Sequence, residues 1–265
     1  LFPIASKALN LFLSCRLMEN FVVSARKYRP QHFSTVVGQS HITTTLKNAI
    51  LQNHLAHAFL FCGPRGVGKT TCARILAKTI NCEHVGADGE ACDKCNSCVS
   101  FNTGSTFNVH ELDAASNNSV DDIRELIDQV RFAPQSGKYK VYIIDEVHML
   151  SNAAFNAFLK SLEEPPKHVV FILATTEKNK IIPTILSRCQ IYDFKKVDIS
   201  SITKLLASIC KDKKIKFDEN SLSLISEKSD GSIRDALSMF DRLVSFTDSN
   251  LTITDVTLNL NVLDY

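Results

Sequence analysis

The sequence predicts an α/β fold with a parallel sheet covered by helices, followed by a small helical domain. Four short segments rich in apolar and β-branched residues alternate with helical patterns, as expected of a parallel sheet. They are residues 58–62, 107–112, 141–144 and 168–174. From about residue 195 onwards, apolar residues recur only at helical spacing. We therefore expect three helices and no further strand in residues 196–260.

A glycine-rich loop follows the first of these strands. Residues 63–70 match the pattern G-x-x-x-x-G-K-[ST], in which backbone amides surround the phosphates of a nucleotide, and a helical pattern follows at once. Lys69 can reach the terminal phosphates, and the Thr70 hydroxyl can bind magnesium. The loop predicts an ATP or GTP site with contacts from Gly63, Pro64, Arg65, Gly66, Val67, Gly68, Lys69, Thr70 and Thr71.

Two acidic residues, Asp145 and Glu146, follow the strand predicted at residues 141–144. Ligands of open α/β sheets bind at the carboxyl ends of the strands. Asp145 is therefore the candidate partner of magnesium, and Glu146 is the candidate base for an attacking water. Acidic pairs in such positions also occur as ordinary solvated loops. The phosphate loop upstream favours the ligand interpretation.

Four of the nine cysteines, Cys82, Cys92, Cys95 and Cys98, lie close together in the sequence. Their C-x9-C-x2-C-x2-C spacing predicts a tetrahedral zinc site, and four sulfur ligands leave no open position, so the metal would be structural. Disulfide bonds are the alternative, but scattered further cysteines fit a reducing compartment better. We expect the others to be small apolar side chains and not ligands; they are Cys15, Cys62, Cys72, Cys189 and Cys210.

The composition, 45% hydrophobic with a formal net charge of +2, is that of a globular chain and is too neutral to indicate nucleic-acid binding by itself. No apolar stretch is long enough to cross a membrane, and a cytoplasmic location is expected. Residues 1–17 contain an apolar run that would fit a weak signal or lipid-anchor segment. A disordered upstream extension is the plainer interpretation, because Met18 stands just before the first recognisable motif.

Seven collinear motifs between Met18 and the C-terminus resemble those of AAA+ ATPases and, among these, of the gamma/tau subunits of bacterial DNA polymerase III. The motifs are residues 24–38, 57–70, 111–118, 145–148, 174–176, 187–189 and 231–237. The resemblance implies an AAA+ α/β domain over residues 18–195, with a zinc insertion at about 82–98, and a three-helix lid over 196–260. The family's C-terminal collar would lie beyond these residues.

The resemblance also implies roles for single residues. Thr176 matches sensor 1, a polar group that orients the attacking water, and Arg188 matches the arginine finger, which acts in trans on the ATP of a neighbouring subunit. Such a finger contributes about 10³- to 10⁵-fold in rate in related phosphoryl transfer. Arg234 matches sensor 2, at the start of a lid helix. The adenine would lie near Val37 and residues 28–30.

Ser116, Asn117 and Asn118 precede a predicted helix, where free amides and polar side chains can bind a phosphate of DNA. Ordinary helix capping is an equally good interpretation of these residue types. Only the family resemblance favours DNA.

The function that the resemblance implies is that of an ATP-hydrolysing motor subunit of DNA polymerase III, which loads the sliding clamp onto primer-template DNA and is not the polymerising subunit. Its partners would be the other clamp-loader subunits in a ring, the clamp, the DNA and, in the tau form, the polymerase. Its cofactors would be ATP, Mg²⁺ and structural Zn²⁺. One alternative, a nucleotide kinase with a zinc lid, is opposed by the acidic pair and the helical second domain. Another, a non-hydrolysing AAA+ scaffold, is opposed by the intact phosphate loop.

Overall fold

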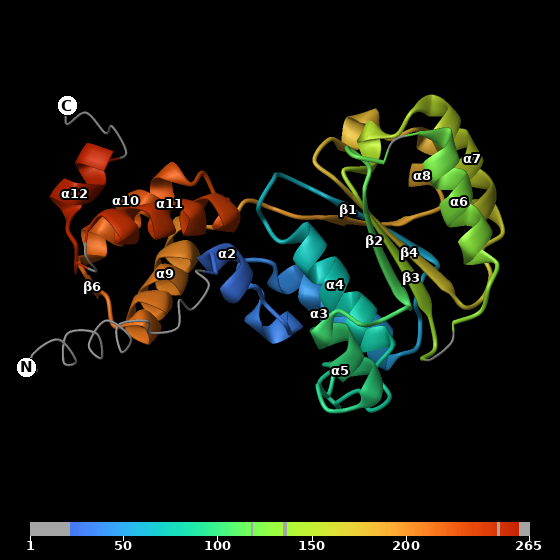
Figure 1. Cartoon of the computed structure of the whole chain (residues 1–265), viewed down its shortest axis with the longest axis horizontal. Helices are drawn as coiled ribbons and strands as arrows, with labels where there is room; N and C mark the ends of the chain where they lie inside the picture. The colour runs from blue at the N-terminus through green and yellow to red at the C-terminus, as the bar shows by residue number, and fades with distance from the viewer. Residues whose placement is uncertain (1–21, 118, 135–136, 248–249, 260–265) are drawn as a thin grey trace, which may run out of the picture.

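The computed structural model describes residues 22–117, 119–134, 137–247 and 250–259, and the expectation for residues 1–17 lies outside them. The described chain forms a five-stranded sheet with helices on both faces and, beside it, a helical lid (Figure 1). The predicted fold class is confirmed. None of the described helices is both long enough and apolar enough to cross a membrane.

The sheet is entirely parallel, with strand order β2-β3-β4-β1-β5. Its strands are β1 (Ala58–Cys62), β2 (Val109–Asp113), β3 (Lys140–Asp145), β4 (Val169–Thr175) and β5 (Gln190–Asp193). The inner strands β1, β3 and β4 are buried along almost their whole length, which explains their continuous apolar sequences. All the strands run in one direction, so their carboxyl ends share one edge of the sheet, where the phosphate loop begins.

Alternate side chains of the strands enter two separate cores. Phe59 and Phe61 of β1 pack with helices α3 (Ser40–Leu51) and α4 (Lys69–Ile80), whereas Leu60 and Cys62 point to the opposite face. That second face is covered by α6 (Val120–Val130), α7 (Asn152–Glu163) and α8 (Pro183–Leu186), as Figure 1 shows. Helix α5 (Asn96–Thr103) belongs to the cysteine-containing insertion after α4.

The edge strand β5 was not predicted from the sequence. Of its residues only Tyr192 is buried, so the segment lacks both a continuous apolar run and a clean alternation. Only its hydrogen-bonded pairing with β1 identifies this segment as a strand.

The lid contains the three expected helices, α9 (Ile199–Lys213), α10 (Glu219–Lys228) and α11 (Ile233–Phe246), and a further helix, α12 (Ile253–Asn259). The expectation of no strand after residue 195 was wrong, since β6 (Lys216–Phe217) pairs with β7 (Asn250–Leu251). Strands of two residues are too short to show a periodic pattern. Helix α2 (Ser24–Lys27), near the start of the described chain, packs on this lid, and Ala25 and Tyr28 contact its core.

Candidate nucleotide site and cysteine cluster

The phosphate loop joins β1 to α4 and passes close to two other parts of the chain. Gly63 has a positive φ of 147°, and a Cβ there would lie 2.4 Å from the carbonyl oxygen of Phe194. Gly66, at φ 76°, would place a Cβ 2.0 Å from Oγ of Ser232, in the lid. These two positions therefore require glycine for conformation and for space. The second also brings the loop against the N-terminus of α11.

Lys69 is the first residue of α4, and its side chain is buried. Its Nζ donates hydrogen bonds to the carbonyl oxygens of Gly63 and Pro64, at 2.7 and 2.8 Å. Burial lowers the pKa of Lys69, and the nearby carboxylates of Glu146 and Asp145 offset this only in part. The ammonium group is therefore poorly compensated inside the loop, and an anion such as a phosphate would stabilise it.

Thr70 and Asp145 meet although they are far apart in the sequence. The Thr70 hydroxyl donates to Oδ2 of Asp145 at 2.6 Å, across the ends of α4 and β3. A hydroxyl oxygen and a carboxylate oxygen that lie side by side are suitable ligands for Mg²⁺. This ion usually keeps several water ligands and binds few protein groups directly. The structure thus brings together both residues predicted to hold magnesium.

Glu146 follows Asp145 in the left-handed backbone region, at φ 47° and ψ 44°. This conformation turns its side chain away from that of Asp145 and toward β4. Its Oε2 accepts hydrogen bonds from the amide and the hydroxyl of Thr176, at 3.1 and 2.9 Å. His148 Nδ1 lies 3.4 Å from the same oxygen. The candidate base, Glu146, and the candidate sensor 1, Thr176, are therefore joined by hydrogen bonds. The sequence did not predict this contact.

A cavity of about 360 Å³ opens beside the phosphate loop, between the sheet domain and the lid. Arg65–Thr71, Asp145 and Glu146 line one end of it, whereas Gly63 and Pro64 contribute only the carbonyls that hold Lys69. Val37 and Arg234 line the cavity as expected, together with Tyr28, Arg29, Pro30, Thr35 and Val36. The mixed apolar and polar lining of the cavity suits a nucleotide base, and the part lined by the phosphate loop suits phosphates.

Lid residues that sequence reasoning missed also line this cavity. They are Leu205, Ser208, Ile209 and Asp212 of α9, and Ile233 and Leu237 of α11. In the sequence Leu205, Ile209, Ile233 and Leu237 belong to ordinary apolar helical stripes, whereas Ser208 and Asp212 look like ordinary exposed polar residues, so no signal marked either group. Arg29 is half-buried here, and burial together with the positive charges of Arg74 and Arg234 lowers its pKa. The cavity therefore concentrates positive charge that a nucleotide would neutralise.

Arg188 lies outside this cavity, on the exposed segment between α8 and β5. Its guanidinium donates to Oε1 of Glu163 at 2.9 Å and to the carbonyl oxygen of Thr184 at 2.8 Å. A residue so placed does not reach the nucleotide site of its own chain. Arg188 is thus an exposed residue that contacts Glu163 and Thr184 and does not line the cavity of its own chain.

The candidate DNA residues lie in the turn between β2 and α6. Ser116 is exposed, and Asn117 uses both its backbone and side-chain amides to donate to the carbonyl oxygen of Asp113. Asn118 lies outside the described residues. These contacts of Asn117 stabilise the turn.

The four cysteines predicted as ligands come together in the structure. Their Sγ atoms all lie within 4.8 Å of one another, and those of Cys82 and Cys95 are 4.0 Å apart. A tetrahedral ion with metal–sulfur bonds of about 2.3 Å requires sulfurs about 3.8 Å apart. The backbone amides of Lys94 and Cys95 lower the pKa of Cys92 to about 6, which favours a thiolate. The donor set and spacing fit a metal ion held by four sulfurs.

The fold and the site define a P-loop protein of the AAA+ class, with a nucleotide pocket between its sheet domain and its lid. Solved structures of the same fold include the RuvB Holliday junction branch migration motor of Thermotoga maritima. It aligns with a TM-score of 0.66 over 89% of this chain and 73% of that chain, at 19% identity. At this identity the likeness concerns the fold alone.

Comparison with families and curated relatives is more specific. A family model described as DNA polymerase III, delta subunit, matches residues 38–198, and one described as DNA polymerase III clamp loader subunit, ATPase lid domain, matches residues 201–249. DNA polymerase III subunit tau of Bacillus subtilis (strain 168) is 53% identical over 233 residues, which are 88% of this chain and 41% of that protein. Subunit tau of Escherichia coli (strain K12) is 45% identical over 92% of this chain and 38% of its own length. The chain belongs to the gamma/tau family of DNA polymerase III clamp-loader subunits.

Proposed function

We propose that this chain is the nucleotide-driven motor part of a clamp loader, which uses ATP to place a sliding clamp on primer-template DNA. The chain spans about two fifths of the length of the tau subunits cited above, so this activity and its partners are inferred for the longer protein. One observation carries the proposal: the Thr70–Asp145 pair and the Glu146 carboxylate line the same cavity as the phosphate loop. The site thus contains what hydrolysis needs as well as what binding needs.

The proposed division of labour follows from the contacts. The loop amides and Lys69 bind the phosphates, and Thr70 and Asp145 hold the magnesium ion, which supplies charge stabilisation to the transferring phosphoryl group. Glu146 accepts a proton from the attacking water, which shares the Glu146 carboxylate with Thr176. Thr176 then fixes the position of the base and of the water.

Communication with other parts of the complex rests on two arginines. Arg234 is the second residue of α11, and its backbone amide lies 3.4 Å from the carbonyl oxygen of Gly66 in the phosphate loop. We infer that nucleotide contacts at this point set the angle of the lid. Arg188, exposed and remote from its own cavity, is suited to complete the ATP site of a neighbouring subunit in the ring.

We propose zinc as the metal of the four cysteines, because a closed set of four sulfurs is typical of structural zinc sites. The primer-template contact of Ser116 and Asn117 remains a proposal that rests on family membership. The clamp, the other loader subunits and, for a tau form, the polymerase remain proposed partners. A subunit of this kind would act in the bacterial cytoplasm, where the chromosome is replicated.

The experiment is an ATP titration of the full-length protein and its Lys69→Ala variant, monitored by binding and by phosphate release. The proposal expects magnesium-dependent ATP binding and hydrolysis in the wild type and neither in the variant. Stimulation of phosphate loss by a small phosphate acceptor, with transfer to that acceptor, would instead support a kinase. Normal hydrolysis by Lys69→Ala would exclude this pocket as the site.

A further inference from the structure

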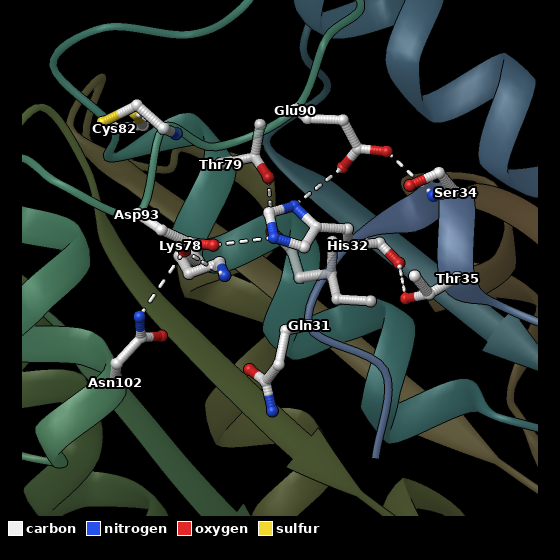
Figure 2. A network of polar contacts seen from close by, with 12 residues as sticks. Gln31, His32, Ser34, Thr35, Lys78, Thr79, Cys82, Glu90, Asp93 and Asn102 are labelled. Atoms are coloured by element: carbon white, nitrogen blue, oxygen red, sulfur yellow. Dashed lines mark hydrogen bonds and ion pairs between the residues drawn. The ribbon is translucent and has the colours of Figure 1, made fainter. Parts of the chain in front are cut away.

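The cysteine-containing insertion contacts the segment that forms one wall of the nucleotide cavity. Two acidic residues of the insertion make these contacts: Glu90, between Cys82 and Cys92, and Asp93, between Cys92 and Cys95. Figure 2 shows both side chains converging on residues 32–34, which lie far away in the sequence. The insertion is therefore fastened to the sheet domain beside the cavity and does not stand alone.

Glu90 holds the backbone of this segment directly. Its two carboxylate oxygens accept the amide hydrogens of Phe33 and Ser34, at 2.9 and 2.8 Å, and Lys47 of α3 pairs with it at 2.8 Å. Only 8% of the Glu90 side chain is exposed. A buried carboxylate with two amides and an ammonium partner is a strong, directional anchor, since each hydrogen bond involves a charge.

Asp93 forms a second anchor around His32. One of its oxygens lies 2.7 Å from Nε2 of His32, and the other accepts from Lys78 of α4, also at 2.7 Å. The Lys78 side chain is only 1% exposed, so Asp93 is its neutralising partner. Asp93 itself has a positive φ of 56° and lies between Cys92 and Cys95 in the sequence.

The anchored residues interrupt the cavity wall. Residues 28–30 line the cavity on one side of the anchored segment, and Thr35, Val36 and Val37 line it on the other. Residues 32–34 do not line the cavity; the His32 side chain and the amides of Phe33 and Ser34 contact the insertion, and the Phe33 side chain packs in the core. Whatever fixes residues 32–34 therefore fixes the ends of both lining stretches.

We propose that Glu90 and Asp93 are positioning residues for the nucleotide, so that the metal-bound insertion sets the shape of the base end of the cavity. The metal fixes the loop from Cys82 to Cys98, that loop orients the two carboxylates, and these hold residues 32–34. This inference rests on the proposed ATP site. Loss of the metal and loss of the Glu90 carboxylate act on the same wall, and they weaken nucleotide binding without removing any phosphate contact.

The test measures two quantities in full-length protein, with zinc bound and after its removal by a chelator in reducing buffer. The first is the dissociation constant for a fluorescent ATP analogue. The second is hydrogen exchange at the amides of Phe33 and Ser34, which needs no nucleotide. Glu90→Gln is the main variant, and Glu83→Gln is its matched control, because Glu83 is an exposed carboxylate of the same loop with no hydrogen bond or ion pair to a described residue. His32→Ala, on the exposed side of the network, is the second variant.

The expected result is a dissociation constant raised about five- to tenfold by Glu90→Gln, with faster exchange at both amides and a kcat close to that of the wild type. Metal removal reproduces this change in the wild type and in Glu83→Gln. Metal removal raises the dissociation constant of Glu90→Gln little further, because both changes act through the same contact between Glu90 and residues 32–34. His32→Ala gives a smaller change in the same direction.

Additive effects of metal removal and Glu90→Gln, or unchanged nucleotide affinity in both Glu90→Gln and His32→Ala, would overturn the inference. If the wild type binds no nucleotide, the proposed function fails instead, and the exchange data still decide whether the metal fixes residues 32–34.

Discussion

Thr176 donates both its hydroxyl and its backbone amide to one carboxylate oxygen of Glu146, at 2.9 and 3.1 Å. Thr176 follows the end of β4, and Glu146 follows β3, the neighbouring strand. The contact fixes the proposed base from two directions, and the left-handed backbone at Glu146 accompanies the turn of its side chain toward the end of β4. The position of the proposed base is therefore determined by residues at the ends of two adjacent strands, β3 and β4.

Removing the Thr176 hydroxyl should reduce turnover and leave binding intact. In Thr176→Ala, Oε2 of Glu146 keeps the amide contact and loses the hydroxyl, so the base is less well positioned. We expect kcat to fall about tenfold to a hundredfold with little change in KM. Steady-state ATPase kinetics measure this. A raised KM at unchanged kcat would show that Thr176 serves nucleotide binding instead.

Replacing the proposed base should separate binding from hydrolysis. Glu146→Gln keeps the shape of the side chain and a group that can accept from Thr176, but it cannot take a proton from water. We expect hydrolysis to fall about 10²- to 10⁴-fold while the affinity for ATP stays within a factor of about three. Equilibrium binding measures the affinity for ATP, and single-turnover kinetics measure the rate of hydrolysis. An active Glu146→Gln protein would mean that another group is the base.

The Arg188–Glu163 ion pair allows a matched pair of variants. Arg188→Ala should remove most ATP hydrolysis in the assembled complex, by about 10³-fold, and leave nucleotide affinity of the isolated chain unchanged. Glu163→Gln, which removes the negative charge from this 2.9 Å contact and so weakens the hold on Arg188, should leave that hydrolysis at or above the wild-type rate. Loss of nucleotide binding by the isolated Arg188→Ala chain would contradict action in trans.

Gly66→Ala should weaken the contact between the phosphate loop and the lid. The added Cβ would lie 2.0 Å from Oγ of Ser232, whose hydroxyl caps α11 by accepting the amide of Asp235. Either the loop or the lid must shift, so we expect at least tenfold weaker ATP binding. A fluorescent-nucleotide titration tests this. Gly104→Ala is the control, because Gly104 also has a positive φ but has open space around it and lies far from the cavity in the sequence.

Zinc analysis and thiol titration test the cysteine cluster. We expect about one zinc per chain and about four thiols that become reactive only when the metal is removed. Thermal unfolding should then show early loss of the insertion, because its core consists largely of the four cysteines themselves. A protein purified without metal that keeps its fold and four freely reactive thiols would contradict a structural site.

Much of the fold could be predicted, because its signals are local. The phosphate loop, the continuous apolar strands β1, β3 and β4, and the amphipathic helices α6 and α11 each carry their pattern within a few residues. The clustering of the four cysteines was also predictable, since their close spacing in the sequence favours a common site. By contrast, β5 and the pair β6–β7 are strands only because a partner lies beside them.

The unpredicted parts of the site depend on contacts between distant residues. Glu90 looks like one exposed acid among many until the fold places it, buried, against the amides of Phe33 and Ser34. Ser24 similarly bonds to Asp241 of α11, which ties α2 to the lid. Neither pair has a spacing or a residue pattern that could be recognised in one sequence. The α9 side chains that line the nucleotide cavity likewise look like ordinary core or surface residues of a helix in the sequence.

The most direct test of the account is the ATPase rate of the full-length protein, assembled with the other clamp-loader subunits, with and without sliding clamp and primer-template DNA. We expect slow basal hydrolysis, strong stimulation only when clamp and DNA are both present, and no stimulation in a complex that carries Lys69→Ala. An ATPase rate that is unaffected by clamp and DNA together would contradict the assignment of this cavity as the trigger of a clamp-loading motor.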